Sequence, residues 1–414
     1  MDEHAIDALT LQRSRVQEPL QGLCLLSSGI GIAAWLDPAQ LLTLLWLLLL
    51  PLLIFRAANR GGAFVVAFLY YAVGAHAVPG IILGFFPKLS TLTSVLLWAG
   101  DAAFLALPWV IAFAPPHATV TRRAVGVTVA LLILSLPPIG FFHWGTPLMV
   151  AGLLFPGWGW VGLGVTAVVL AMIAVAGKHT HKVHAAIAVA ALFAIVANAR
   201  YREPVPPADW RAISLESGRN PELWSDDMAA KREGLADLAM VALSSGAKVI
   251  IFPEASSGSS RRAQMYIWAG VSTQAKVRGA TVLVGEETWD AARTGFQNAL
   301  IGFGAEKDGG AVVVSSMVPM PMGDWKFGFG EGAETNLFGS DVIELHGMKV
   351  AFSMCFEDFL LWPHRGLLSG RADLFVSATN QWPSSGTSAE TIQDISRAAL
   401  SRMAGVAMLV AKNR

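Results

Sequence analysis

Cysteine is scarce in this sequence, which has only Cys24 and Cys355 among its 414 residues. Two cysteines so far apart form neither a disulfide framework nor the closely spaced ligand pairs of a structural zinc site. This scarcity excludes a disulfide-stabilised scaffold and a cysteine-based metal centre, and we expect the protein to need no metal and no cofactor. Any chemistry assigned to cysteine has to come from a single thiol.

Charge is the second feature that the sequence lacks. Only 14% of the residues are charged, and 30 basic side chains balance 30 acidic ones, so the formal net charge is zero. Without a basic patch, nucleic acid is not expected as a partner. Apolar residues instead make up 54% of the chain, and the mean hydropathy is +0.52. That balance is too apolar for an ordinary soluble protein.

The apolar residues are concentrated in the first half of the chain, where only nine charged residues lie between positions 20 and 199. A helix needs roughly 20 apolar residues to cross the roughly 30 Å hydrocarbon layer of a membrane. On this criterion we predict a multi-span helical membrane domain over residues 21–199. Its seven spans are expected at 21–36, 40–55, 63–86, 92–114, 124–142, 150–176 and 183–199.

Basic residues occur in every second loop between these predicted spans. They are Arg13 and Arg15, Arg56 and Arg60, Arg122 and Arg123, and Lys178 and Lys182. Because loops rich in Lys and Arg stay in the cytoplasm, a tail over residues 1–20 is expected there. The first apolar stretch lacks the features of a cleaved signal, so we expect it to be an anchor. The pattern predicts a multi-pass protein of the bacterial inner membrane, with its polar half periplasmic.

Asp101 lies midway along the fourth predicted span. An ionisable side chain inside a membrane is costly and commonly functional. The alternative is a packed polar contact or a position near a cavity. The sequence leaves both interpretations of Asp101 open.

The polar half begins after a proline-rich linker at residues 200–208, and the pattern predicts an extracytoplasmic α/β domain over 209–414. Helical spacing occurs at 226–244, 261–278 and 388–403. Short apolar runs typical of buried strands occur at 212–215, 247–252, 281–284, 298–303, 311–315, 348–354, 372–377 and 406–411. Alternation of strands with helices predicts a layered α/β domain.

Two of these apolar runs end in reactive side chains. Glu254 follows the run at 247–252, and Cys355 follows the run at 348–354. A partly buried carboxylate has a raised pKa and can take up a proton near neutral pH, while a thiolate attacks carbonyl carbon to form a thioester. Taken singly, Glu254 is equally well explained as a helix-start acid and Cys355 as a small buried apolar residue. Together they favour a cysteine-dependent acyl-transfer site.

The segments around these two residues resemble the glutamate and cysteine motifs of the nitrilase superfamily. They read Ile-Ile-Phe-Pro-Glu-Ala at 250–255 and Met-Cys-Phe-Glu-Asp-Phe-Leu-Leu-Trp-Pro at 354–363. The segments at 296–300 and 378–382 are similar to further motifs of apolipoprotein N-acyltransferase, which also has a multi-span domain before an extracytoplasmic nitrilase domain. The stretch at 318–325 looks closer to a plasmid-encoded branch, the conjugal transfer proteins TraB. The resemblance covers nearly the whole chain and implies an α-β-β-α sandwich for its polar half.

What the resemblance implies for the site is a Glu-Lys-Cys triad, with Glu254 as general base and Cys355 as nucleophile. The family's lysine, which would stabilise the oxyanion, has no clear counterpart here. Different alignments place Val314, Ser316 or Gly323 at its position. The nearest lysine is Lys326.

Two further expectations come from the resemblance. Glu357 corresponds to a family residue that orients the lysine or the leaving group, although it is also explained as a surface carboxylate near a helix start. The family continues beyond the strand expected at 406–411, whereas this sequence ends at Arg414.

These observations predict a membrane-bound acyltransferase or amidase of the carbon–nitrogen hydrolase superfamily, associated with plasmid conjugal transfer or with lipoprotein N-acylation. Its expected partners are a membrane lipid and a membrane-embedded peptide or lipoprotein, with pilin and other conjugation components as further candidates. One alternative is an enzyme that processes or cyclises pilin. The other is a non-catalytic membrane component of a conjugation apparatus with a degenerate nitrilase domain.

Overall fold

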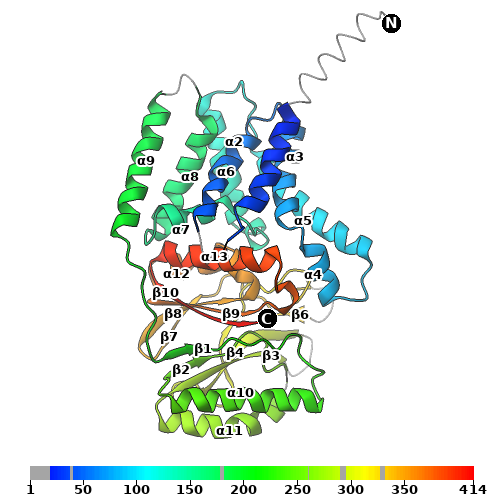
Figure 1. Ribbon diagram of the computed structural model, residues 1–414, viewed down its shortest axis with the longest axis vertical. Coiled ribbons are helices and arrows are strands. Elements are labelled where there is room, and N and C mark those ends of the chain that lie inside the picture. Colours follow the sequence, from blue (N-terminus) through cyan, green and yellow to red (C-terminus); the bar gives the residue numbers. More distant parts are fainter. Residues whose placement is uncertain (1–18, 38–40, 178–180, 260, 290–294, 327–331) are drawn as a thin grey trace, which may run out of the picture. The chain divides into compact units, whose positions relative to one another are not determined.

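The computed structural model describes residues 19–37, 41–177, 181–259, 261–289, 295–326 and 332–414. Internal contacts divide the chain into two units, both visible in Figure 1. The first unit comprises the residues up to Tyr201 together with Gly386–Ala399. The second comprises Arg202–Ser385 and Leu400–Arg414.

The first unit is helical. After a helix at Pro19–Ala33 it contains η1 (Leu41–Leu49), α2 (Leu50–Ile54), α3 (Arg60–Gly74), α4 (Val78–Phe85), α5 (Thr91–Ile111), α6 (Val120–Ser135), η2 (Ile139–Phe141), η3 (Pro147–Val150), α7 (Ala151–Leu154), α8 (Gly159–Val175) and α9 (His181–Arg200). Side-chain oxygens of Asn59, Ser90 and Thr119 accept hydrogen bonds from the first turns of α3, α5 and α6. Such caps satisfy backbone N–H groups that have no partner within the helix.

Within the described residues, α5 and α9 are each long and apolar enough to cross a membrane. Two bent pairs, Arg60–Gly74 with Val78–Phe85 and Pro147–Leu154 with Gly159–Val175, raise this number to at most four. The predicted seven spans are therefore not confirmed. Two of the predicted stretches form only the shorter helices Pro19–Ala33 and Leu41–Ile54. An α-helix of about 15 residues reaches about 23 Å, less than the hydrocarbon layer of roughly 30 Å.

Asp101, on α5, accepts a hydrogen bond from the indole nitrogen of Trp144 at 2.9 Å. Nearby, the Tyr71 hydroxyl contacts Nε2 of His143 at 2.9 Å and accepts a hydrogen bond from Trp109. These bonds join α3, α5 and the segment before η3. The arrangement gives Asp101 the packed polar contact that was one of its two interpretations, and it does not test the other.

The second unit contains two β-sheets. The six-stranded sheet has the order β1–β2–β3–β4–β5 with β6 paired to β4, and its strands are β1 (Trp210–Ala212), β2 (Val249–Ile251), β3 (Thr281–Trp289), β4 (Gly295–Gly304), β5 (Ala311–Ser315) and β6 (Gly332–Ala333). The four-stranded sheet has the order β10–β9–β8–β7, with β7 (Val342–Leu345), β8 (Met348–Met354), β9 (Leu374–Asn380) and β10 (Ala407–Asn413). Strands β8, β9 and β10 run parallel.

Helices α10 (Asp226–Ser244) and α11 (Arg261–Val277) cover one face of the six-stranded sheet. Leu235, Trp268 and Phe303 belong to the core between them and the strands. The opposite face carries Ile251, which shares a second core with Phe352 and other residues of the four-stranded sheet. This helix–sheet–sheet order gives three layers of the expected α-β-β-α sandwich. The remaining long helix, α13 (Ser388–Ala404), groups with the first unit over Gly386–Ala399.

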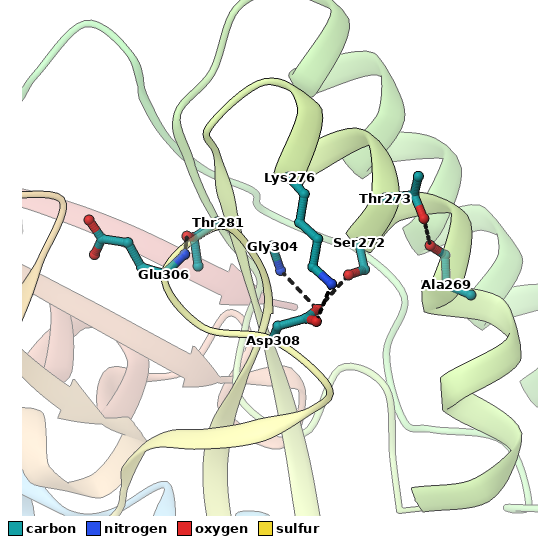
Figure 2. A network of polar contacts seen from close by, with 8 residues as sticks. All are labelled: Ala269, Ser272, Thr273, Lys276, Thr281, Gly304, Glu306 and Asp308. Atoms are coloured by element: carbon teal, nitrogen blue, oxygen red, sulfur yellow. Dashed lines mark hydrogen bonds and ion pairs between the residues drawn. The ribbon is translucent and has the colours of Figure 1, made fainter.

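The turn between β4 and β5 is fixed by Asp308, as Figure 2 shows. Its carboxylate forms an ion pair with Lys276 and accepts a hydrogen bond from Ser272 Oγ at 2.5 Å, both from α11. It also accepts the backbone N–H of Gly304 at 3.4 Å. The network holds the β4–β5 hairpin against α11. The strands predicted at 298–303 and 311–315 correspond to β4 and β5, which pair antiparallel.

Candidate active site

Glu254 and Cys355 lie just beyond the ends of strands in different sheets. Glu254 follows β2, and Cys355 follows β8 as the first residue of the 3-10 turn η4 (Cys355–Phe359). Ile251 of β2 and Met354 of β8 belong to the core between the two sheets. Face-to-face packing therefore brings both strand ends to one place, and the Cys355 thiol hydrogen-bonds to the Glu254 carboxylate. The structure unites the two residues on which the sequence prediction depends.

The Glu254 carboxylate is buried, with 5% of the residue exposed. Oε1 accepts a hydrogen bond from the Asn298 amide at 2.5 Å, and Oε2 accepts the backbone N–H of Asn380 at 3.0 Å. Burial and the nearby negative charge of Asp324 raise the pKa of Glu254 to about 8, although its hydrogen bonds act in the opposite direction. A carboxyl group with this pKa exchanges a proton near neutral pH, as a general base must.

Cys355 has a strained backbone, with φ of +47°. Few non-glycine residues occupy this left-handed region, and those that do are found disproportionately at functional sites. Its Sγ lies 4.0 Å from the carbonyl oxygen of Asn380. Burial, followed by the charge of Glu254, raises the thiol pKa well above its ordinary value, against smaller opposing effects of the Asn380 backbone and the Thr379 hydroxyl. The resting nucleophile is therefore a thiol, which needs a base to become reactive.

Glu357 is buried and anchors the turn that carries the cysteine. Oε1 accepts hydrogen bonds from Ser316 Oγ at 2.8 Å, from Met317 N at 2.5 Å and from Val318 N at 2.9 Å. Oε2 accepts the N–H of Met354 at 2.9 Å. Burial raises the pKa of Glu357 to about 7, and these donors oppose that rise. Glu357 is not a surface carboxylate, which excludes that alternative. These hydrogen bonds orient the backbone on both sides of the site.

Asp358, Ser353 and Ser377 form a second buried set behind the turn, which the sequence did not indicate. Asp358 accepts hydrogen bonds from Ser353 Oγ at 2.6 Å and from Ser377 Oγ at 2.9 Å, so it links η4 to β8 and β9. His364, in η5 (Trp362–His364), lies 3.0 Å from the carbonyl oxygen of Glu357. Three ionisable side chains thus hold the backbone of the nucleophile turn.

Lys326, the predicted third member of the triad, donates to the carbonyl oxygen of Met322 at 3.3 Å. Its charge also acts on Asp324, whose pKa is raised to about 6 by burial despite this lysine. Asp324 in turn raises the pKa of Glu254. Lys326 is thereby linked to the site through Asp324, and its contact with a reacting atom stays a prediction. Ser316, one of the alternative positions for the family lysine, instead contacts Glu357.

Sequence reasoning missed two carboxylates that accompany Glu254. Burial and the charge of Asp324 raise the pKa of Glu287 to about 7, so Asp324 affects Glu254 and Glu287 together. The Gly-Asp-Trp stretch had marked the position of Asp324 only by resemblance, and nothing marked Glu287. Among the described residues, no group of three or more His, Cys, Asp or Glu side chains is arranged to hold a metal ion.

No protein-family model matches the chain. It is 29% identical over 410 residues to the conjugal transfer protein TraB of Agrobacterium fabrum, covering 94% of this chain and 92% of that protein. It is 26% identical over 401 residues to a probable conjugal transfer protein TraB of Sinorhizobium fredii, covering 95% and 97%.

Among solved structures, it matches a carbon–nitrogen hydrolase from Helicobacter pylori with 14% identity and a TM-score of 0.31, over 41% of this chain and 59% of that one. An amidase from Nesterenkonia sp. matches with 13% identity and a TM-score of 0.34, over 49% and 75%. The chain is thus confirmed to be similar, over nearly its whole length, to proteins named conjugal transfer protein TraB.

Proposed function

We propose that this protein is a membrane-bound amidase or acyltransferase of nitrilase type that forms a thioester on Cys355 during plasmid conjugal transfer. The observation that carries the proposal is the hydrogen bond between the Cys355 thiol and the Glu254 carboxylate. It pairs a nucleophile with a base whose pKa of about 8 suits proton transfer.

The reaction needs two steps through the same pair. In the first, Glu254 accepts the thiol proton while Sγ of Cys355 attacks a carbonyl carbon, and the departing amine or alcohol takes that proton. In the second, Glu254 accepts a proton from an incoming amine or water, which attacks the thioester carbon and releases the thiol. An amine acceptor makes the enzyme an acyltransferase, and water makes it an amidase.

The negative oxygen that forms in each step needs hydrogen-bond donors. The backbone N–H of Phe356 and the ammonium group of Lys326 are our candidates. Removing a single oxyanion donor commonly lowers the rate on the order of 10²–10³-fold. The proposed role of Lys326 is therefore open to a direct test by substitution.

We place the protein in the bacterial inner membrane, with the second unit in the periplasm. Helices α5 and α9, each long and apolar enough to span, support membrane insertion, and the alternating basic loops support the orientation. The proposed substrates are a membrane lipid as acyl donor and a membrane-embedded peptide or lipoprotein as acceptor. Processing or cyclisation of a pilin subunit uses the same thioester chemistry, and the names of the two curated relatives support the conjugation context.

One observation favours a second candidate, a non-catalytic scaffold of the conjugation apparatus. Ser316 contacts Glu357 at one of the positions where alignment with the family places the catalytic lysine. A thiol whose pKa is raised well above its ordinary value is also unreactive unless a base assists it. On this account the retained Glu254 and Cys355 would have no catalytic use.

Plasmid transfer from donor cells that carry single-residue variants distinguishes the two candidates. The enzyme account predicts that Cys355→Ala, Cys355→Ser and Glu254→Gln each lower transfer to the level of a deletion, with the variant proteins present at normal amounts. Cys24→Ala is the matched control, because it removes the other thiol from the first unit. Normal transfer with Cys355→Ala would support the scaffold and refute the enzyme.

A further inference from the structure

Asn413, at the end of β10, uses every hydrogen-bonding position of its side chain. Only 1% of the residue is exposed. Oδ1 accepts hydrogen bonds from Ser217 N at 3.1 Å and from Ser217 Oγ at 2.9 Å. Nδ2 donates to Gly218 O at 2.8 Å and to Asn380 Oδ1 at 2.9 Å. With two donors and two acceptor sites all paired, the orientation of the Asn413 amide is fixed.

The backbone around Asn413 holds it in register with β9. In the parallel pairing of β10 with β9, Asn413 lies opposite Asn380. The carbonyl oxygen of Asn413 accepts the N–H of Gln381 at 2.7 Å. On the other side of β10, Leu215 donates to the carbonyl oxygen of Lys412 at 2.8 Å. Backbone hydrogen bonds on both sides of β10, from β9 and from the segment at Leu215, therefore hold Asn413 beside Asn380.

Asn380 is the residue whose backbone contacts both reacting groups. Its N–H donates to Oε2 of Glu254 at 3.0 Å, and its carbonyl oxygen lies 4.0 Å from Sγ of Cys355. Although β9 ends at Asn380, the bond from Gln381 N–H to the Asn413 carbonyl oxygen still holds its outgoing peptide. The side-chain bond from Asn413 to Asn380 Oδ1 adds a second point of attachment, so Asn413 holds Asn380 through both its backbone and its side chain.

We infer that Asn413 is a positioning residue, which acts through Asn380 to hold Glu254 and Cys355 in contact. The inference rests on the proposed function, because it assigns Asn413 to the same cysteine–glutamate pair. Loss of the side-chain bond from Asn413 leaves Asn380 attached to β10 by the Gln381 N–H alone, and its two backbone contacts with Glu254 and Cys355 weaken together. The opposing interpretation is purely structural: Asn413 would only hold the segment at Ser217 and Gly218 against β10.

Three substitutions separate these interpretations. Asn413→Asp keeps the shape but removes both donated hydrogen bonds, including the bond to Asn380. Asn380→Ala removes the acceptor of that bond and leaves the contacts of Asn413 with Ser217 and Gly218 available. Ser217→Ala is the matched control, since it removes one hydrogen bond to Asn413 and leaves Asn380 untouched.

The measurement is the rate at which iodoacetamide alkylates Cys355 in the full-length protein between pH 6 and 10, followed by peptide mass spectrometry, with Cys24 as internal reference. We expect Asn413→Asp and Asn380→Ala each to slow alkylation about 5-fold at a given pH, the effect of one lost hydrogen bond. Each should also move the midpoint to higher pH, because the Asn380 N–H donated to Glu254 lowers the pKa of that carboxyl group. The double variant should be no slower than the slower single variant.

Two results would overturn the inference: a wild-type profile for Asn380→Ala, or an equal effect of Ser217→Ala and Asn413→Asp. If Asn413→Asp does not fold, Asn380→Ala alone decides, because its profile tests the same bond. A different result would refute the proposed function itself. If Glu254 does not activate the thiol, Glu254→Gln will leave the alkylation profile of Cys355 unchanged in an otherwise wild-type protein.

Discussion

The Cys355 thiol hydrogen-bonds to the Glu254 carboxylate, although the two residues follow strands of different sheets. Their contact depends on how the sheets stack, through a core that includes Ile251 and Met354. The same contact raises the thiol pKa, while burial and Asp324 raise the pKa of Glu254 to about 8. At neutral pH both groups therefore hold their protons, and the pair becomes reactive as the carboxyl group ionises.

The first prediction concerns this pH dependence. Alkylation of Cys355 should rise with pH through about 8, where Glu254 loses its proton. Asp324→Asn removes a negative charge that raises the pKa of Glu254, so it should lower that pKa and shift the rise to lower pH. The check is the alkylation rate of Cys355 across the pH range in both proteins.

Asp308→Asn is the matched control for this shift, because it removes a carboxylate from the separate network drawn in Figure 2. Its alkylation profile should follow the wild type. A profile that does not move in Asp324→Asn, or moves equally in both variants, would show that Asp324 does not tune the site.

The second prediction compares two buried carboxylates that anchor the nucleophile turn. Glu357 accepts backbone N–H groups of Met317, Val318 and Met354, which cannot reverse direction. Glu357→Gln turns an amide N–H toward one of them and should destabilise the protein by about 1–3 kcal/mol. Asp358 accepts hydrogen bonds from two serine hydroxyls, which can rotate and accept instead, so Asp358→Asn should cost less.

Denaturant unfolding of both variants, in the membrane-mimetic medium used for the wild type, measures this difference. Glu357→Gln should also slow the alkylation of Cys355, because the carboxylate bonds directly to the residue before the cysteine. Equal losses of stability in the two variants would contradict the assignment of Glu357 to fixed backbone donors.

Some elements of the second unit follow directly from the sequence. The helix predicted at 226–244 matches α10, with Ser225 as its N-cap and two aspartates in its first turn. The strand predicted at 348–354 matches β8, whose last five residues, Val350–Met354, are buried. The residue pattern that predicts such a helix or strand lies within a single short segment of the chain. The reactive residues that follow β2 and β8 were predictable for the same reason.

Other features depend on contacts between distant segments, which a periodic pattern does not record. The roles of three residues become apparent only in the folded structure, where loops and strand ends meet: Asp324, Glu287 and Asn413. The short strand β7 was missed because four residues are too few for a clear alternation. In the first unit, apolar composition predicted spans, but helix ends and bends decided their lengths.

The third prediction concerns Gly332, in β6. A Cβ atom at this position would lie 2.7 Å from the carbonyl oxygen of Asp324 and 2.7 Å from Cγ of Lys326. The backbone oxygen cannot give way without moving the segment that carries Asp324. Gly332→Ala should therefore displace that carboxylate and shift the alkylation profile of Cys355 to lower pH, as Asp324→Asn does.

Gly234 in α10 provides the matched control, since a Cβ atom there meets nothing within 4 Å. Gly234→Ala should leave the profile unchanged and stabilise the protein by about 0.5–1 kcal/mol, because alanine loses less backbone freedom on folding than glycine does. A wild-type profile in Gly332→Ala would show that this close approach does not position Asp324.

The fourth prediction concerns acid stability. Burial opposes ionisation of Asp308, but its contacts with Lys276 and Ser272 outweigh that effect and lower its pKa to about 2. A lowered folded-state pKa means that Asp308 stabilises the protein above its unfolded pKa of about 3.9, and that this contribution disappears as the pH falls toward 2. Asp308→Asn should be less stable than wild type at pH 5, with the difference vanishing near pH 2.

Urea unfolding at a series of pH values measures the difference in unfolding free energy between the wild type and Asp308→Asn. Because the ion pair with Lys276 is exposed, we expect this difference to be small. The alkylation profile of Cys355 provides the accompanying check, because it should not change. A stability difference that stays constant from pH 5 to pH 2 would contradict the role of the Asp308 charge.

The central claim, a thioester on Cys355, is tested most directly by intact-mass spectrometry of the protein purified from native membranes beside its Cys355→Ala variant. We predict a mass increment in the wild type that neutral hydroxylamine removes and that Cys355→Ala lacks. An increment of fatty-acyl size indicates a lipid donor, and one of peptide size indicates a pilin-like substrate. Identical unmodified masses for both proteins, with no alkylation of Cys355 at any pH, would contradict the enzyme account and favour the scaffold.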